Sequence, residues 1–279
     1  LYTSDKKFSV LLAYACGFVS GHELAKVGVD INFSPVVDIN RNLSKNTQHV
    51  LKDRCFGKNV ETILELAKAY INGSVCGGVV PVLKHYPGHG SIDGDTHIDY
   101  CSSNLERDEL KEDLLPFFTL NEHSSGNIPI MTSHIKFPNV DNEIVSYSTR
   151  WLSDIQAEEI GRRILFISDD LEMKAAITEE NITATQRVIK SLMAGCDMVI
   201  ATTMLKSNII ASKKSYEYFN KYYLTQELID FYKDVCDDVD RAFLEYTLYS
   251  TRNKVALSDF PSSYEENLDL IKNYNEQNY

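Results

Sequence analysis

The chain has 279 residues, of which 43% are hydrophobic and 24% charged, a globular composition sufficient for one large domain or two small ones. The formal net charge of −12 argues against a nucleic-acid partner, which would require a basic face, and against docking on an anionic membrane. Six cysteines occur without a Cys-x-x-Cys pair, so neither a zinc knuckle nor a redox pair is indicated. We therefore expect reduced thiols and a cytoplasmic location.

The first apolar stretch, residues 8–16, follows Lys6-Lys7 and resembles a signal sequence that ends at a lipid-attachment cysteine. Its periodicity favours a helix instead, because the apolar side chains fall on one helical face: Phe8, Leu11, Leu12, Ala15 and Val19. We expect an amphipathic helix that packs on a sheet, and no apolar run long enough to span a bilayer.

Five short apolar runs rich in Val, Ile and Leu predict buried parallel strands at 30–37, 79–83, 128–131, 164–167 and 198–201. Helical patterns lie between them at 61–72, 105–120, 149–159 and 183–194, and Gly195 is the expected C-cap of the last. Alternating strands and helices predict an α/β fold.

The strand count bears on the architecture. A closed TIM (β/α)8 barrel needs eight strands, and five are found, so we expect a barrel that is incomplete at its N-terminus. Residues 1–205 would form the catalytic barrel domain. Residues 206–279 would form a helical C-terminal region that completes or flanks the barrel, and its last stretch, 259–279, would be a mobile tail.

The segment Lys84–His97 follows the second predicted strand and carries the strongest chemical signal. Lys84 and His85 stand at the strand end, where they can donate hydrogen bonds to sugar hydroxyls. Asp95 and His97 are two residues apart on a turn, so the carboxylate can hold one ring nitrogen while the other exchanges a proton. The alternative is a solvated turn with incidental polar residues.

Two adjacent carboxylates, Asp169 and Asp170, follow the fourth predicted strand. Side chains of adjacent strand residues point in opposite directions, so one can enter the barrel mouth while the other caps a helix that begins near Leu171. We expect Asp169 to act as a nucleophile and Asp170 to act as a cap.

Three further polar residues follow predicted strands. His134 either touches the substrate or fills the core beside Phe137, and Asp38 is expected to brace a loop. Arg54 lies in a loop, where its guanidinium could bind hydroxyls or simply remain solvated.

Together these segments resemble the bacterial β-N-acetylglucosaminidase (NagZ-type) branch of glycoside hydrolase family 3. The resemblance rests on five segments in family order within residues 1–205: Asn32-Phe-Ser-Pro-Val-Val-Asp38, Asp53-Arg-Cys-Phe-Gly57, Lys84-His-Tyr-Pro-Gly-His-Gly90 with Asp95-Thr-His97, Met131-Thr-Ser-His-Ile135 and Ser168-Asp-Asp-Leu-Glu-Met173. It implies a TIM-barrel enzyme that removes terminal β-linked N-acetylglucosamine, typically from muropeptides in cell-wall recycling.

The resemblance also assigns roles to residues. Asp169 matches the nucleophile, His97 the acid/base residue and Asp95 its dyad partner. Sugar-binding positions are matched by three further residues, Arg54, Lys84 and His85, to which His134 is added as a possible substrate contact. No metal or organic cofactor is expected, and the protein is expected to be a monomer.

The family carries an earlier Asp-Gln-Glu-Gly-Gly stretch whose aspartate grips the sugar, and this sequence lacks it. The resemblance therefore aligns the five predicted strands with family strands 4 to 8 and predicts that three are missing.

Three alternatives stay open. The first is a β-glucosidase of the same family, and the second is an inactive sugar-binding fragment. The third is a metal-dependent TIM-barrel hydrolase, whose zinc ligands would come from His85, His89, Asp95, His97 and Asp169.

Overall fold

The computed structural model describes residues 5–41, 51–92, 94–123, 128–202, 210–212, 260–261 and 263–278. The strands are β1 (Ile31–Asn32), β2 (Val80–Pro81), β3 (Leu83–Tyr86), β4 (Ile130–Thr132), β5 (Phe166–Asp170), β6 (Met198–Ile200) and β7 (Ile210–Ser212). The α-helices are α1 (Lys6–Lys26), α2 (Val60–Gly77), α3 (Lys111–His123), α4 (Ile155–Glu159), α5 (Ala184–Ala194) and α9 (Tyr264–Asn278). Short helices are η1 (Lys52–Arg54), η2 (Arg107–Leu110), η3 (Val145–Tyr147), the π-helical η4 (Arg150–Asp154) and η5 (Lys174–Ala176).

The strands form parallel sheets in chain order. β3, β4, β5 and β6 pair in parallel, and β7 adds an antiparallel strand beside β6. β1 pairs in parallel with β2, and a bridge between Val36 and Lys84 continues this pairing towards β3. The predicted α/β class is confirmed, with the run 79–83 divided between β2 and β3. Within the described residues no pairing closes the sheet, so the barrel itself stays a prediction.

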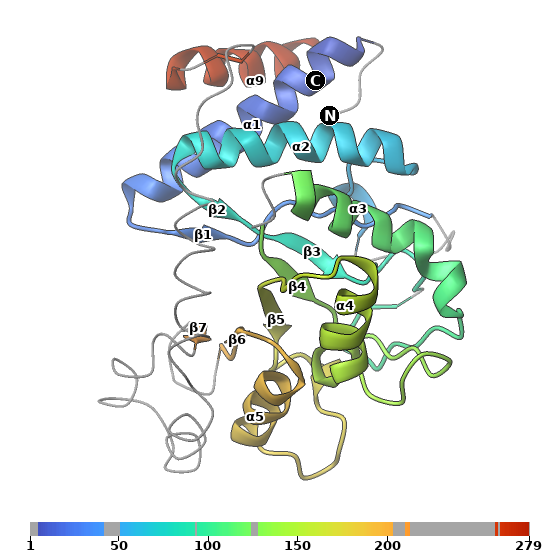
Figure 1. Cartoon of the computed structure of the whole chain (residues 1–279). Coiled ribbons are helices and arrows are strands. Elements are labelled where there is room, and N and C mark those ends of the chain that lie inside the picture. The colour runs from blue at the N-terminus through green and yellow to red at the C-terminus, as the bar shows by residue number, and fades with distance from the viewer. Residues whose placement is uncertain are drawn as a thin grey trace.

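Each central strand is buried on both faces, which explains why its sequence is almost continuously apolar. One face packs into a large core that includes Leu83, Ile130 and Phe166. The opposite face forms a second cluster: Val82, Met131, Leu165, Ile167, Met198 and Ile200. In Figure 1, α2, α3, α4 and α5 follow one another around the outer side of the sheet. The second cluster therefore lies on the inner side.

The helix boundaries follow local capping chemistry. α5 begins with a capping box, in which Thr183 accepts from the Gln186 N–H and the Gln186 side chain accepts from the Thr183 N–H. The helix ends at Gly195, whose φ of 126° suits glycine, so the predicted C-cap is confirmed. A second capping box, between Glu106 and Glu109, opens η2 ahead of α3.

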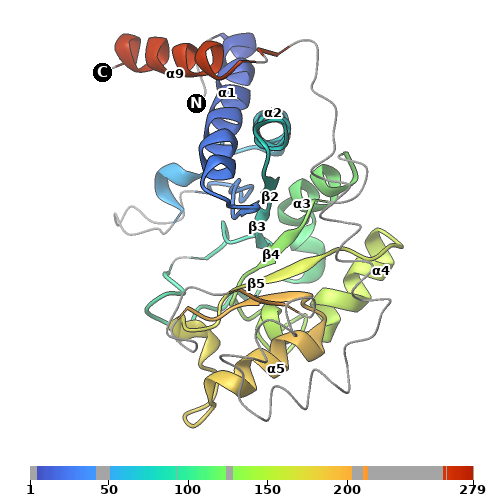
Figure 2. The same ribbon diagram turned by 90° about the vertical axis from the view of Figure 1, so that its left-hand side faces the viewer.

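α1, α2 and α9 form a helical layer above β1 and β2 (Figures 1 and 2). The prediction that α1 packs on a sheet is wrong, because α1 packs mainly against the helices α2 and α9. By length and composition α1 could cross a bilayer, contrary to the expectation from the sequence. Half of the apolar stretch of this helix is buried inside the protein. A buried core helix has the same length and composition.

The expected mobile tail is also corrected, because 264–278 forms helix α9. Its Tyr264 hydroxyl donates to Glu23 at 2.6 Å, and the Tyr264 ring lies 5.0 Å from the His22 ring of α1. The polar sequence of α9 concealed this contact, which depends on one aromatic side chain.

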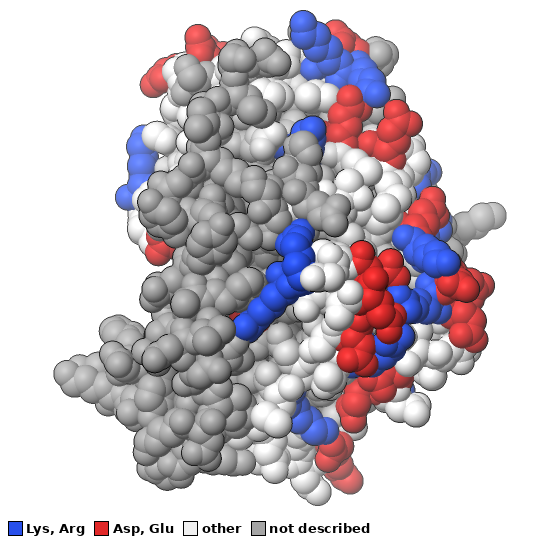
Figure 3. Space-filling model, viewed as in Figure 1, with Lys and Arg blue, Asp and Glu red and all other residues white. Residues whose placement is uncertain are grey.

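Acidic and basic side chains are interspersed on the described part of the face in Figure 3. Arg150 pairs with Glu158 at 2.6 Å, and Arg107 bonds both Glu158 and Glu159. Exposed pairs of this kind contribute little stability individually.

Glycines allow α1 and α2 to cross with their backbones in contact. A Cβ at Gly73 would lie 2.1 Å from the Tyr14 carbonyl oxygen, and one at Gly17 would lie 2.1 Å from the Tyr70 oxygen. These obstacles are backbone atoms, which cannot rotate away as a side chain can. The crossing therefore requires glycine on both helices.

We expect Gly73→Ala to lower the free energy of unfolding by about 2 kcal/mol, because the added methyl forces the helices apart. Helix propensity alone would give the opposite sign. Asn72→Ala, one position earlier on α2, is the control and should leave stability unchanged or raise it. Chemical denaturation of both variants is the measurement, and a Gly73→Ala protein as stable as the parent would contradict the packing account.

Candidate active site

The buried carboxylate of Asp38 organises the loop that follows β3. Its oxygens accept the backbone N–H groups of His85 and His89, the latter at 2.8 Å. Oδ2 also lies 2.7 Å from Nδ1 of the His85 ring. Asp38 is 1% exposed. The predicted bracing role of this residue matches its contacts.

The charge of Asp38 is maintained by these contacts. Burial alone would raise the pKa of Asp38, but the His85 ring and the His89 N–H lower it below its ordinary value. An ionised carboxylate can only accept a hydrogen bond, so Nδ1 of His85 carries a proton and donates it to Asp38. This bond holds the His85 ring in one orientation and leaves Nε2 for other contacts.

Asp169 stands at the carboxyl end of β5. Ile167, two residues earlier, belongs to the inner cluster, so strand alternation places Asp169 on the inner side of the sheet. Its Oδ1 accepts the Asp170 N–H at 2.8 Å. Burial opposes ionisation, but His85, this N–H and the Lys84 ammonium hold the pKa of Asp169 below its ordinary value. Asp169 is therefore an ionised carboxylate in a confined site.

The Lys84 ammonium acts on the Asp169 charge, and Arg54 in turn acts on Lys84. Lys84, on β3, is half-buried; burial lowers its pKa, and the like charge of Arg54 lowers it further. The Asp169 and Asp38 carboxylates oppose this shift. Arg54 comes from η1 and is itself exposed. The structure thus places the predicted sugar-binding residues Lys84 and His85 near Asp169, and it places Arg54 near Lys84.

His134, at the end of β4, is fixed through both ring nitrogens. Nε2 lies 3.0 Å from the carbonyl oxygen of Asp170 and Nδ1 lies 2.7 Å from Oγ of Ser146. The carbonyl can only accept, so Nε2 carries the proton and Nδ1 accepts from Ser146. Burial lowers the pKa of His134, which keeps the ring neutral. Its contacts position the strand end that carries Asp169, and the predicted substrate contact stays a prediction.

Asp170 points away from Asp169 and acts as a structural acceptor. Its carboxylate accepts the Glu172 N–H at 3.0 Å and the Thr202 hydroxyl at 2.6 Å. The second bond ties the turn after β5 to the end of β6. The predicted helix near Leu171 is absent, because residues 171–173 are not helical and η5 begins only at Lys174 without a side-chain cap. Asp170 therefore braces this turn and does not cap a helix.

Asp95 and His97 form a close pair on an exposed loop. Asp95 Oδ1 lies 2.6 Å from Nδ1 of His97 and also accepts the His97 backbone N–H at 2.9 Å. Burial opposes ionisation of Asp95, but these two bonds lower its pKa. The His97 side chain is 57% exposed. The dyad predicted from the two-residue spacing is therefore present as a geometric pair.

The loop that bears Asp95 and His97, residues 94–100 (the dyad loop), is attached to the segment that follows Asp169. The N–H groups of Lys174 and Ala175, in η5, donate to the carbonyls of His97 and Thr96 at 3.2 and 3.1 Å. His89 Nε2 lies 3.4 Å from the Thr96 hydroxyl and connects the loop to the Asp38 centre. The dyad and Asp169 thus belong to adjoining segments.

Sequence reasoning did not assign positioning roles to His89 or Ser146. Both act through contacts with residues distant in the chain, so only the clustering of histidines near the strand end could have pointed to His89. A Cβ at Gly90 would lie 2.0 Å from the Ile39 carbonyl oxygen, so this glycine lets two backbone segments meet.

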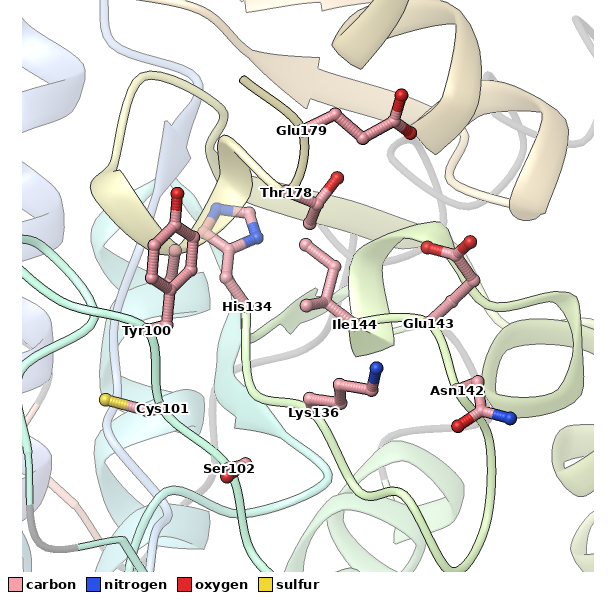
Figure 4. Close-up of a pocket in the computed structure, with 11 residues that line it drawn as sticks. Tyr100, Cys101, Ser102, His134, Lys136, Asn142, Glu143, Ile144, Thr178 and Glu179 are labelled. Carbon is pink, nitrogen blue, oxygen red and sulfur yellow. The ribbon is translucent and has the colours of Figure 1, made fainter. Parts of the chain in front are cut away.

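A cavity of about 420 Å³ lies beside His134 (Figure 4). Its walls come from the end of the dyad loop, the segment after β4 and the segment after η5, including Tyr100, Lys136, Glu143 and Thr178. His134 therefore lies between this cavity and Asp169.

Comparison with known proteins supplies the family. Residues 3–230 match the model described as the glycosyl hydrolase family 3 N terminal domain. The chain belongs to glycosyl hydrolase family 3. This glycosyl hydrolase family 3 chain is 37% identical over 193 residues to a beta-hexosaminidase of Nitrosomonas eutropha, a match covering 69% of this chain and 53% of that protein. A beta-hexosaminidase of Hydrogenovibrio crunogenus is 34% identical over 200 residues, covering 71% and 54%. The chain thus spans about half the length of these relatives.

Solved structures of glycosyl hydrolase family 3 proteins share the fold. NagZ from Neisseria gonorrhoeae in complex with N-trifluoroacetyl-D-glucosamine matches with a TM-score of 0.61 and 25% identity, over 87% of this chain and 70% of that one. A family 3 beta-N-acetylglucosaminidase from Paenibacillus matches with a TM-score of 0.68 and 22% identity, over 96% and 51%.

We expect Asp38→Asn to lower the free energy of unfolding by about 3 kcal/mol at neutral pH, because the substitution removes a buried charge whose hydrogen bonds hold His85 and His89. The folded pKa of Asp38 lies below the unfolded value of about 3.9, so the parent's contribution is complete above that pH and is lost as pH falls through the folded pKa. The variant's stability should therefore fall less steeply below about pH 4. Urea unfolding of both proteins from pH 3 to 7 measures this. If the free energy of unfolding falls equally steeply with pH in the parent and the variant, Asp38 is not the ionised group described here.

Proposed function

We propose that this protein is a retaining glycosidase that removes terminal β-linked N-acetylglucosamine. The observation that carries the proposal is an ionised carboxylate, Asp169, at a strand end among cations, beside a loop that bears the Asp95–His97 pair. The relatives named beta-hexosaminidase support this sugar specificity over that of a β-glucosidase.

In the proposed first step Asp169 attacks the anomeric carbon and forms a covalent glycosyl-enzyme. The leaving oxygen takes a proton from Nε2 of His97, whose imidazolium form is stabilised by Asp95 through Nδ1. In the second step neutral His97 takes a proton from water, which displaces Asp169. Retaining glycosidases usually pair two carboxylates. Here an imidazole replaces the second one, so no further negative charge faces Asp169.

Binding groups surround the sugar position in this proposal. Lys84 and Arg54 donate to hydroxyls, and His85 offers the ring nitrogen that Asp38 does not use. A lowered pKa at Lys84 weakens its hold on a proton without removing its donors. In this proposal residues of β3 and η1 bind the N-acetyl sugar, and β5 supplies the nucleophile.

We place the reaction in the cytoplasm, on N-acetylglucosamine-containing glycans such as muropeptides from the cell wall, and propose that the chain acts as a monomer. None of the described cysteines, 16, 55, 76, 101 and 196, forms a disulfide with another, which supports a reducing compartment.

A metal-dependent hydrolase would need a cluster of metal ligands. In the described part of the chain no three His, Cys, Asp or Glu side chains lie close enough together to form one. His85 and Asp95 are instead engaged with Asp38 and His97. The alternative of a sugar-binding protein without activity is decided by the following experiment.

We expect the parent to cleave both an N-acetylglucosaminyl disaccharide and a nitrophenyl N-acetylglucosaminide. His97→Ala should lower kcat/KM for the disaccharide by about 10²–10⁴, the usual value of general acid–base catalysis. The loss on the aryl glycoside should be smaller, because a nitrophenolate leaves with little protonation. Steady-state kinetics of both substrates measure this.

His22→Ala is the matched control, since His22 lies on α1 against Phe18 and Tyr264, and it should keep parental rates. Binding of N-acetylglucosamine without cleavage of either glycoside would overturn the proposed activity. Equal losses on both substrates in His97→Ala would overturn the role of His97.

A further inference from the structure

Tyr100 connects the dyad loop to the segment after β5 through its side chain. Its hydroxyl donates to the carbonyl oxygen of Ile177 at 2.6 Å, and the Lys174 ammonium lies 4.9 Å from the centre of its ring. Tyr100 follows His97 by three residues and is 54% exposed. We propose that Tyr100 is a positioning residue that holds His97 in place for proton transfer. This inference rests on the proposed function.

The dyad loop needs such an attachment because few of its side chains are buried. His97 is exposed, and Ile98, the next residue, is 74% exposed. Two backbone bonds, from Lys174 and Ala175, join the loop to η5 on the His97 side. Tyr100 adds a third attachment beyond His97, so the loop is held to the same segment on both sides of the acid/base residue.

Small displacements at this point have large consequences. A general acid must come within hydrogen-bond reach of the oxygen it protonates, about 3 Å. A misplacement of about 1 Å can cost about 10²-fold in rate. Losing one of several attachments shifts only part of the population of loop conformations. The expected effect is therefore moderate and confined to steps that need the proton.

Tyr100 also lines the cavity beside His134, so its ring and its hydroxyl must be tested separately (Figure 4). Tyr100→Phe keeps the ring, with its contact to the Lys174 ammonium and its place in the cavity wall. The substitution removes only the hydroxyl that donates to Ile177. A loss of activity in Tyr100→Phe would therefore result from losing the hydrogen bond to Ile177.

The chain supplies a matched control in Tyr147. Its hydroxyl donates to the carbonyl oxygen of Ala176 at 2.8 Å, one residue before Ile177. Tyr147 belongs to η3 and not to the dyad loop. Tyr147→Phe thus removes an equivalent bond to the same segment without releasing the loop.

The test compares kcat/KM of both variants with the parent on the disaccharide and on the nitrophenyl glycoside. Tyr100→Phe should lose about fivefold on the disaccharide, as expected for one hydrogen bond, and less than twofold on the aryl glycoside. Tyr147→Phe should affect the two substrates equally. Equal losses in Tyr100→Phe, no loss, or the same substrate dependence in Tyr147→Phe would each overturn the proposal.

A second readout does not require activity. The Lys174 and Ala175 amides are hydrogen-bonded only while the loop is docked, so their exchange with deuterium should be several-fold faster in Tyr100→Phe than in the parent. Unchanged exchange would overturn the attachment. If the parent cleaves neither glycoside, the proposed function fails, while this exchange still decides whether Tyr100 holds the loop.

Discussion

The carboxylate of Asp38 is the interaction on which the site depends. It is buried and ionised, and it accepts from the N–H and the imidazole of His85 in β3 and from the N–H of His89 in the loop after β3. These bonds hold His85, which acts on the Asp169 charge, and place His89 beside the dyad loop at Thr96. A buried charge is costly unless its bonds are made, so the loop has one strongly preferred arrangement. Residues from three separate segments are aligned in this way by a single acceptor.

The charge distribution around Asp169 differs from that of the chain as a whole. The protein carries a net charge of −12, yet the groups that lower the pKa of this carboxylate include Lys84 and His85, and Arg54 lies near Lys84. Cations near a buried carboxylate keep it ionised and able to attack. Its sequence neighbour Asp170 instead spends its oxygens on Glu172 and Thr202. Two adjacent carboxylates therefore differ because alternate strand positions face different surroundings.

The sequence predicted much of the sheet because burial on both faces leaves a clear apolar signal at each strand, as at Ile164–Ile167. It also predicted the Asp95–His97 pair from the two-residue spacing, and strand alternation predicted that Asp169 and Asp170 face different surroundings. It could not predict that α9 packs on α1 through Tyr264, because a single aromatic contact leaves no periodic pattern. Nor could it find Tyr100, whose partner Ile177 lies 77 residues away along the chain.

The stereochemistry of sugar release tests the central claim most directly. A site in which Asp169 attacks the anomeric carbon inverts the configuration twice, so the first product is β-N-acetylglucosamine. Proton NMR of the anomeric region during the first minutes of hydrolysis distinguishes the anomers before mutarotation mixes them. The account predicts that the β anomer appears first and that α accumulates later. Initial release of the α anomer, or no release of sugar, would contradict it.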